Sequence, residues 1–236
     1  GDLDDITIFD TALDASEINL LYTGDWLNPL VPPALADYRF EEGSGLTAGD
    51  SNNGMDGTIS GATFVTDSMD GSYSLNFDGT DDEVVIDHTS LLNITSALSL
   101  AAWIKTNDTN ANQCIIGKNA AYYIYLYSGT YGSRIRTGLR INGSWVVFTS
   151  SNSSSNSIPA NTWAHVAMTY DGSEIITYLN GMDVGSTTQT GNLNTSSSDL
   201  ELGTIWNSFR FSGLMDAVQI YDFALAPDEV EALAGL

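Results

Sequence analysis

The sequence predicts an all-β protein, built as a two-sheet antiparallel sandwich with a short helix near its C-terminal end. Two observations predict this fold class. From residue 35 to residue 220, short apolar runs with a period of two are separated by clusters of Gly, Asn, Asp and Ser. A helical period is almost absent from the same stretch. Many short strands at regular turn spacing are typical of a two-sheet sandwich.

Each element follows from its local pattern. The apolar runs predict strands over residues 36–40, 74–77, 83–86, 98–105, 114–117, 122–127, 134–141, 145–149, 163–170, 175–179, 200–202 and 214–221. Asp171-Gly172 and Asn180-Gly181 predict hairpin turns, because these pairs tolerate positive φ. After the last strand, Pro227 opens a short helix, since proline suits the first helical turn.

The sequence also predicts how the chain is divided. Residues 1–21 align without gaps on residues 213–233, as expected for a tandem array cut one element early. We therefore expect residues 1–24 to be the last strand and helix of a preceding repeat, residues 25–34 a Pro-rich linker, and residues 35–236 the domain itself. Because that domain already has a final strand, the N-terminal copy should lie outside the sandwich or on another copy of the chain.

Composition excludes two classes of partner. The chain has 30 acidic residues against 7 Lys and Arg, a formal charge of −23, and such a surface repels phosphate backbones and anionic lipid headgroups. We expect no nucleic-acid binding, and no membrane insertion because no apolar run is long enough to span a bilayer. The hydrophobic content of 42% is sufficient for a folded core. Few lysines among many Ser, Thr, Asn and Gly residues favour an extracellular or cell-surface location.

Seven short motifs occur in an order that resembles a known family. They are residues 38–45, 50–57, 75–79, 98–105, 161–172, 178–181 and 213–221. Together they are similar to the laminin-G-like, concanavalin A-like jelly-roll domains of bacterial secreted proteins. The resemblance implies a jelly-roll β-sandwich over residues 35–236. Such domains serve as carbohydrate-binding modules, as adhesive repeats and as spacers. The resemblance therefore implies one fold but leaves several functions open.

An enzymatic role is not expected. Glucanases of this fold class carry Glu-x-Asp-x-Glu on one strand, so that alternate carboxylates share one face of a cleft. The acidic runs at residues 41–42 and 81–83 lack that alternation. His165 is interpreted as a hydrogen-bonded structural residue, and Trp103 and Trp163 as core residues.

The resemblance also implies one structural calcium ion. Hard carboxylate and carbonyl oxygens select calcium over transition metals, and matching the family pattern points to Asp216 and Asp78 with backbone around Glu41. A separate loop site at Asp50 is an alternative. The other interpretation is that these carboxylates only cap and close turns.

For a ligand, the tyrosine-rich run at residues 122–127 is the strongest candidate. Alternation places three phenols on one face, and aromatic rings with hydroxyl tips suit sugars. They are Tyr123, Tyr125 and Tyr127. Three of the five arginines follow directly, and guanidinium groups bind carboxylate or sulfate in a bidentate manner. They are Arg134, Arg136 and Arg140. Trp206, with Phe209, Arg210 and Phe211, is a second candidate patch. The alternative is that the arginines pair with nearby carboxylates and the tyrosines only stiffen exposed strands.

These observations predict a non-catalytic carbohydrate-binding module of a larger secreted or cell-surface protein, with an anionic polysaccharide as a candidate ligand, a structural calcium ion, and neighbouring domains of the same polypeptide as further partners. The alternative is an adhesive or spacer repeat without a small ligand. An aromatic surface that also carries arginine favours the first, and a surface filled by salt bridges favours the second.

Overall fold

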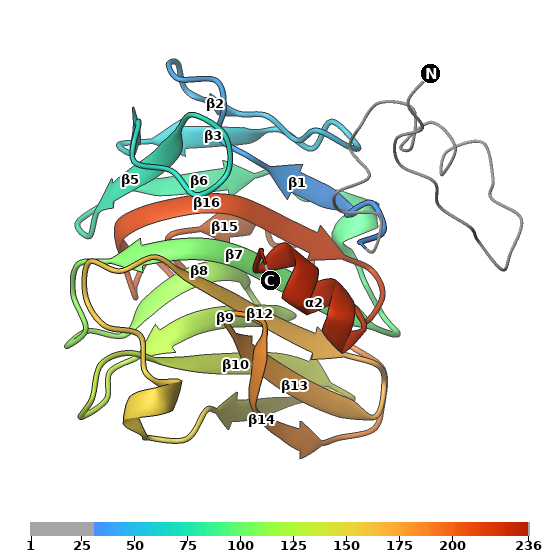
Figure 1. Ribbon diagram of the computed structural model, residues 1–236. Coiled ribbons are helices and arrows are strands. Elements are labelled where there is room, and N and C mark those ends of the chain that lie inside the picture. Colours follow the sequence, from blue (N-terminus) through green and yellow to red (C-terminus); the bar gives the residue numbers. More distant parts are fainter. Residues whose placement is uncertain (1–30, 236) are drawn as a thin grey trace, which may run out of the picture.

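The computed structural model describes residues 31–235, which form two antiparallel sheets packed face to face (Figure 1). Sheet A contains β1 (Ala36–Tyr38), β4 (Thr63–Val65), β5 (Ser74–Asp78), β7 (Leu98–Thr106), β12 (Ala164–Tyr170), β13 (Glu174–Leu179), β14 (Met182–Thr188) and β16 (Ser212–Tyr221). Sheet B contains β2 (Thr47–Ala48), β3 (Gly57–Ser60), β6 (Glu83–Ile86), β8 (Gln113–Lys118), β9 (Tyr122–Tyr127), β10 (Arg134–Ile141), β11 (Ser144–Thr149) and β15 (Leu200–Leu202).

The chain passes repeatedly from one sheet to the other. Sheet A runs β14-β13-β12-β7-β16-β5-β4, with β1 paired to β16, and sheet B runs β11-β10-β9-β8-β15-β6-β3-β2. Single 3-10 turns lie at Ser90–Leu92 and Ser154–Asn156, and the helix α2 spans Pro227–Leu233. The predicted all-β jelly-roll sandwich with a short C-terminal helix is confirmed. No helix among residues 31–235 is long and apolar enough to cross a membrane.

All the predicted strands are present, and four further strands were not predicted. β2, β3, β4 and β14 are short or rich in Thr, Ser and Gly, so they lack the apolar alternation that marks the others. Such strands are held by pairing with neighbours rather than by their own pattern. The predicted upstream repeat at residues 1–24 and most of the linker at residues 25–34 lie outside the described residues.

Hairpin turns form where the sequence predicts them. Asn180 and Gly181 have φ of 49° and 75° and join β13 to β14, which is the conformation that a two-residue hairpin requires. Asp171-Gly172 joins β12 to β13, where one Asp171 carboxylate oxygen accepts the N–H groups of Ser173 and Glu174, each at 2.8 Å.

The core lies between the sheets and is built by alternation. Along β7, the residues at 98, 100, 102 and 104 face the other sheet. Trp103 therefore points outward, and its ring lies 5.4 Å from that of His165 on the outer face of sheet A. Trp163 precedes β12, and its indole N–H donates to Asp67 at 2.9 Å. The prediction that both tryptophans belong to the core is wrong, because strand parity outweighs residue size.

The helix α2 covers part of the outer face of sheet A, where it lies across β16, β7 and β12 in Figure 1. A small apolar cluster joins the helix to the sheet. Its buried members are Ala34, Ala101, Ala167, Tyr178, Tyr221, Leu225 and Val230. The Glu229 carboxylate accepts the N–H of Ala226 at 2.6 Å and caps the first turn. One face of sheet A is thus only partly covered, and a hollow remains beside the helix.

Candidate functional site

The outer face of sheet B carries the tyrosines of β9. Alternation sends Tyr122, Ile124 and Leu126 into the core and leaves Tyr123 and Tyr125 on the opposite face, with Tyr127 packed beside them.

Two glycines make room for the aromatic and aliphatic side chains on this face. Gly138 pairs with Tyr123 across β9 and β10, and a Cβ at that position would overlap the Tyr123 ring. Gly117 lies on the other side of Tyr123, and a Cβ there would come within 2.8 Å of Ile205. The missing side chains let Tyr123 and Ile205 lie flat against the sheet, so the surface is broad rather than ridged.

The loop between β15 and β16 folds back onto the same face. Trp206 and Asn207 have φ of 59° and 50° and form a tight turn in which Ser208 N–H donates to the Ile205 carbonyl at 3.0 Å. The Trp206 indole N–H donates to Asn119 Oδ1 at 2.8 Å, and the Phe209 carbonyl accepts the N–H of Cys114 at 2.6 Å. A tryptophan in the left-handed region costs conformational energy, and such strain is typical of ligand-binding segments.

We define the aromatic cluster as five side chains that meet on this face. They are Tyr123, Tyr125, Trp145, Trp206 and Phe209. The Tyr123 ring lies 5.0 Å from Tyr125, 5.2 Å from Trp145 and 5.8 Å from Trp206. Phe209 stacks on Tyr125 with ring centroids 5.7 Å apart. These distances are those of favourable aromatic pairs.

The tryptophans form the accessible part of the cluster. Trp145 and Trp206 are 39% and 43% exposed, whereas Tyr123 and Tyr125 are buried beneath them. The sequence interpretation, in which the phenols themselves line the surface, is therefore wrong for these two tyrosines. Burial raises the pKa of Tyr123 to about 12, so its hydroxyl stays protonated at neutral pH and supports the neighbouring rings as a neutral group.

Arg136 and Arg134 stand at one end of the cluster. The Arg136 guanidinium carbon lies 3.6 Å from the centre of the Tyr127 ring, and its nitrogens donate to Thr149 Oγ1 at 2.7 Å and Tyr125 Oη at 3.1 Å. The guanidinium of Arg134 lies 5.2 Å from the same ring. Arg134 also donates to the Ser150 carbonyl at 3.3 Å. Cation–π contacts and hydrogen bonds to uncharged oxygens thus hold both groups in place while leaving their charge uncompensated.

Arg140 lies at the other end of β10, where its Nε donates to the Gly143 carbonyl at 3.3 Å. Among residues 31–235, none of Arg134, Arg136 and Arg140 forms an ion pair with a carboxylate. The alternative, in which these arginines pair with nearby carboxylates, is therefore not found in the described part of the chain. Arg210 does form such a pair, with Glu83 at 2.9 Å.

A small hollow adjoins Trp206 near the start of β9, where the Arg140 N–H donates to the Ala121 carbonyl. Its volume is about 300 Å³, and its lining is polar apart from Trp206. The lining residues are Asn119, Ser198, Asp199, Glu201, Trp206 and Asn207. Burial raises the pKa of Glu201, and the nearby Glu83 adds to this effect. The acidic hollow thus lies near the Arg140 end of the face, whereas Arg134 and Arg136 lie near the other end of β9.

The two carboxylates predicted to share one calcium ion, Asp216 and Asp78, do not lie together. Asp78 pairs with Ser212, four residues before Asp216, so Asp216 and Asp78 are separated by roughly 13 Å along the strands. Asp78 instead lies beside Asp81 and Asp82.

The other predicted ligands are occupied by backbone donors. Asp216 Oδ2 accepts the N–H groups of Met69 at 2.7 Å and Asp70 at 2.9 Å, and its Oδ1 accepts that of Ala217. Asp50 accepts four backbone N–H groups, at 37, 52, 53 and 55. Glu41 accepts those of residues 72 and 73. The predicted set does not fit a single calcium ion, and these carboxylates fasten loops to strands.

Sequence reasoning missed Trp145, which is the outermost ring of the cluster on β11. The turn at residues 142–143 places Trp145 directly opposite Arg140, and this register could have predicted that Trp145 lies beside an arginine of β10. The second predicted patch separates in the structure, because Phe211 is buried in the core while Trp206 and Phe209 join the cluster.

Comparisons with known proteins place this geometry in a family. A family model described as the concanavalin A-like lectin/glucanases superfamily matches residues 78–231. No curated protein sequence matches the chain. Among solved structures, the chain is similar to domain 4 of AbnA, an extracellular GH43 arabinanase of Geobacillus stearothermophilus, in complex with arabinotriose. The identity is 21% and the TM-score 0.66, and the match covers 85% of this chain and 98% of that domain.

Toxin binding domains also share the fold. The binding domain of Paraclostridial Mosquitocidal Protein 1 is 18% identical, with a TM-score of 0.69 and coverage of 85% of this chain and 51% of that chain. The binding domain of botulinum neurotoxin DC in complex with SialylT is 15% identical, with a TM-score of 0.64 and coverage of 86% and 50%. The chain thus spans about half the length of these toxin domains. With well over half of its residues matched by the family model, the chain belongs to the concanavalin A-like lectin/glucanase superfamily and forms a laminin-G-like jelly-roll domain.

Proposed function

We propose that this chain is a non-catalytic carbohydrate-binding module of a larger secreted or cell-surface protein, and that the glycan lies on the aromatic cluster. One observation carries the proposal. The exposed rings of Trp145 and Trp206 share one face with Arg136, which bonds to Tyr125 of the cluster, and no carboxylate of residues 31–235 neutralises Arg134 or Arg136.

The chemistry of this surface suits an anionic sugar. Flat apolar rings stack on the CH face of a sugar, and a guanidinium group binds a carboxylate or sulfate through two parallel hydrogen bonds. Arg136 is already oriented by Tyr127 and Thr149, so little further ordering is needed when an oxyanion binds. A polysaccharide that carries uronic acid or sulfate groups is therefore the favoured ligand. The calcium prediction has no part in this proposal.

Structural neighbours support a binding role at the level of the fold. The arabinanase domain is described in complex with arabinotriose and the neurotoxin domain in complex with SialylT. Both are parts of larger proteins, as we propose for this chain.

A glycan array followed by calorimetry tests the proposal. The array contains neutral, uronic and sulfated oligosaccharides, and the variants are Trp206→Ala, Trp145→Ala and Arg136→Gln. We expect either tryptophan variant to lose about tenfold in affinity, equivalent to about 1.4 kcal/mol. Arg136→Gln should weaken acidic glycans more than their neutral counterparts, because only the acidic ones use the guanidinium charge.

Met182→Ala is the matched control, since Met182 is an exposed apolar residue on the far edge of sheet A. Binding of an acidic glycan that survives both tryptophan substitutions would overturn the assignment to this face. A folded chain that binds no glycan at all would leave the alternative of an adhesive or spacer repeat, which the similarity of residues 1–21 to residues 213–233 favours.

A further inference from the structure

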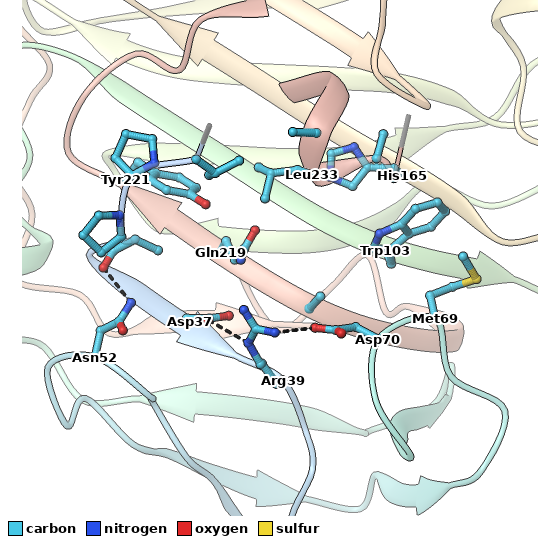
Figure 2. A pocket seen from close by; sticks show the side chains of 18 residues that line it. Asp37, Arg39, Asn52, Met69, Asp70, Trp103, His165, Gln219, Tyr221 and Leu233 are labelled. Atoms are coloured by element: carbon cyan, nitrogen blue, oxygen red, sulfur yellow. Dashed lines mark hydrogen bonds and ion pairs between the residues drawn. The ribbon is translucent and has the colours of Figure 1, made fainter. Parts of the chain in front are cut away.

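A larger hollow lies on the opposite side of the molecule, on the outer face of sheet A (Figure 2). It has a volume of about 730 Å³ and is bounded by the chain before β1, the loop that carries Met69 and Asp70, and the end of α2. This volume is in the range of small-molecule sites, roughly 300–1,000 Å³. The aromatic cluster, by contrast, lies on sheet B.

Specific bonds hold the walls of this cavity in place. Asp216 accepts the backbone N–H groups of Met69 and Asp70 and so fixes the loop against β16. Arg39 donates to Asp37 at 2.9 Å and to Asp70 at 2.7 Å, which ties β1 to the same loop. The cavity is therefore preorganised by the fold.

A buried polar atom without a partner adjoins this space. His165 is 1% exposed and lines the cavity, yet its Nδ1 makes no hydrogen bond with any of residues 31–235. The buried Asp37 carboxylate has the Gln219 side chain beside it as a hydrogen-bond donor. Buried polar atoms of folded proteins nearly always have a partner, so His165 Nδ1 indicates a missing one. Trp103 lies beside His165, and Figure 2 shows its indole nitrogen on the side of Gln219.

The charge balance of the cavity restricts the ligand. Arg39 is neutralised by two carboxylates, so it cannot attract an anion as Arg134 and Arg136 can. Burial lowers the pKa of His165 to about 3, so the imidazole is uncharged at neutral pH and offers one donor and one acceptor. The cavity thus combines hydrogen-bonding groups with the half-buried ring of Trp103 and has no free cation.

From this arrangement we propose that the cavity is a second binding site, independent of the aromatic cluster, and that it takes an uncharged polyhydroxylated ligand such as a neutral sugar unit. The sugar stacks on Trp103 and exchanges hydroxyl hydrogen bonds with His165, Gln219 and Asp37. A uronic acid or sulfated sugar is disfavoured, because Asp37 and Asp70 repel its charge.

The test uses the full chain carrying Trp145→Ala and Trp206→Ala, which removes the exposed rings from sheet B. Nitrogen-resolved NMR follows the Trp103 indole and the His165 ring during titration with glucose, galactose, arabinose and their β-linked disaccharides, up to about 20 mM, which detects sites with a Kd of about 1 mM. We expect at least one sugar to shift both signals saturably while the Trp163 indole stays unchanged. The corresponding uronic acid should bind more weakly.

Trp103→Ala, monitored at the His165 ring, should weaken the binding at least tenfold, and Trp163→Ala is the matched control. The proposal is overturned if none of these sugars shifts Trp103 in the folded chain, if Trp163 responds equally, or if the uronic acid binds more tightly. A silent glycan array for sheet B would leave this result unaffected, because the two sites share no residue.

Discussion

The buried imidazole of His165 makes the stability of this domain depend on pH. Burial lowers its pKa from 6.5 to about 3. As pH falls, the unfolded chain therefore binds a proton before the folded chain does, and stability that is fully present above pH 6.5 is lost below it. Integration gives a loss of about 2 kcal/mol at pH 5 and about 4 kcal/mol at pH 3.

Urea unfolding at pH 7.0 and pH 5.0 measures this contribution. His165→Gln cannot take up the proton, so its unfolding free energy should change with pH by about 2 kcal/mol less than that of the parent chain over this interval. Comparing the difference between the two proteins removes the contribution of carboxylates that both retain. These include Asp37 and Asp216, for which burial raises the pKa.

His88→Gln is the control, because His88 is the only other histidine in the chain. It lies half-buried in a loop, with its backbone N–H bonded to Asp199 and its Nδ1 3.2 Å from Lys118 Nζ. This variant should retain the pH dependence of the parent. If His165→Gln and the parent show the same pH dependence, the folded imidazole takes up its proton over the same pH range as the unfolded one, and the lowered pKa of His165 is wrong.

Three further substitutions follow from the packing. Gly138→Ala should cost about 1–3 kcal/mol of stability by overpacking, and it should also weaken glycan binding because the added methyl group displaces Tyr123. Denaturant unfolding measures the first effect and calorimetry the second. Unchanged glycan binding would contradict the role of this glycine. Asp216→Asn should destabilise the fold by about 2–4 kcal/mol, since an amide cannot accept all three N–H groups. Thermal melting should show the same loss of stability in calcium and in EDTA. A loss that depends on calcium would restore Asp216 as a calcium ligand. Asn180→Ala should lower the free energy of unfolding in urea by about 1–2 kcal/mol, because Asn180 has a positive φ and its side chain accepts the N–H of His165. An unchanged free energy of unfolding would mean that the turn relaxes to fit alanine.

Strand faces were the most predictable part of the structure. A period of two in an apolar run decides which residues face the core, and Ile124 and Leu126 are enough to orient β9 and its tyrosines. The same rule fails when size is weighed above parity, as for Trp103. Short polar strands such as β3 and β14 could not be predicted, because their pairing depends on neighbours that are distant in the chain.

The candidate sites were less predictable, for a physical reason. A strand pattern shows that Tyr123 and Tyr125 leave the core, but a loop more than 75 residues away in the chain covers them, and only the fold brings Trp206 and Phe209 there. Carboxylates are equally ambiguous in sequence, because the same oxygens bind calcium or backbone N–H groups. Asp216 accepts three N–H groups, and the spacing of acidic residues alone cannot distinguish this from a metal site.

The placement of the cations is the strongest reason to expect a functional surface on sheet B. In a chain of net charge −23 with only seven Lys and Arg residues, each cation that meets a carboxylate relieves repulsion. Three do so, namely Arg39, Lys105 and Arg210. Lys118 is buried, which lowers its pKa. The remaining three, Arg134, Arg136 and Arg140, lie on one strand and pair with no carboxylate of residues 31–235, although acidic residues are more than four times as numerous. Stability alone would favour pairing them, so their separation from carboxylates supports the proposed anionic ligand.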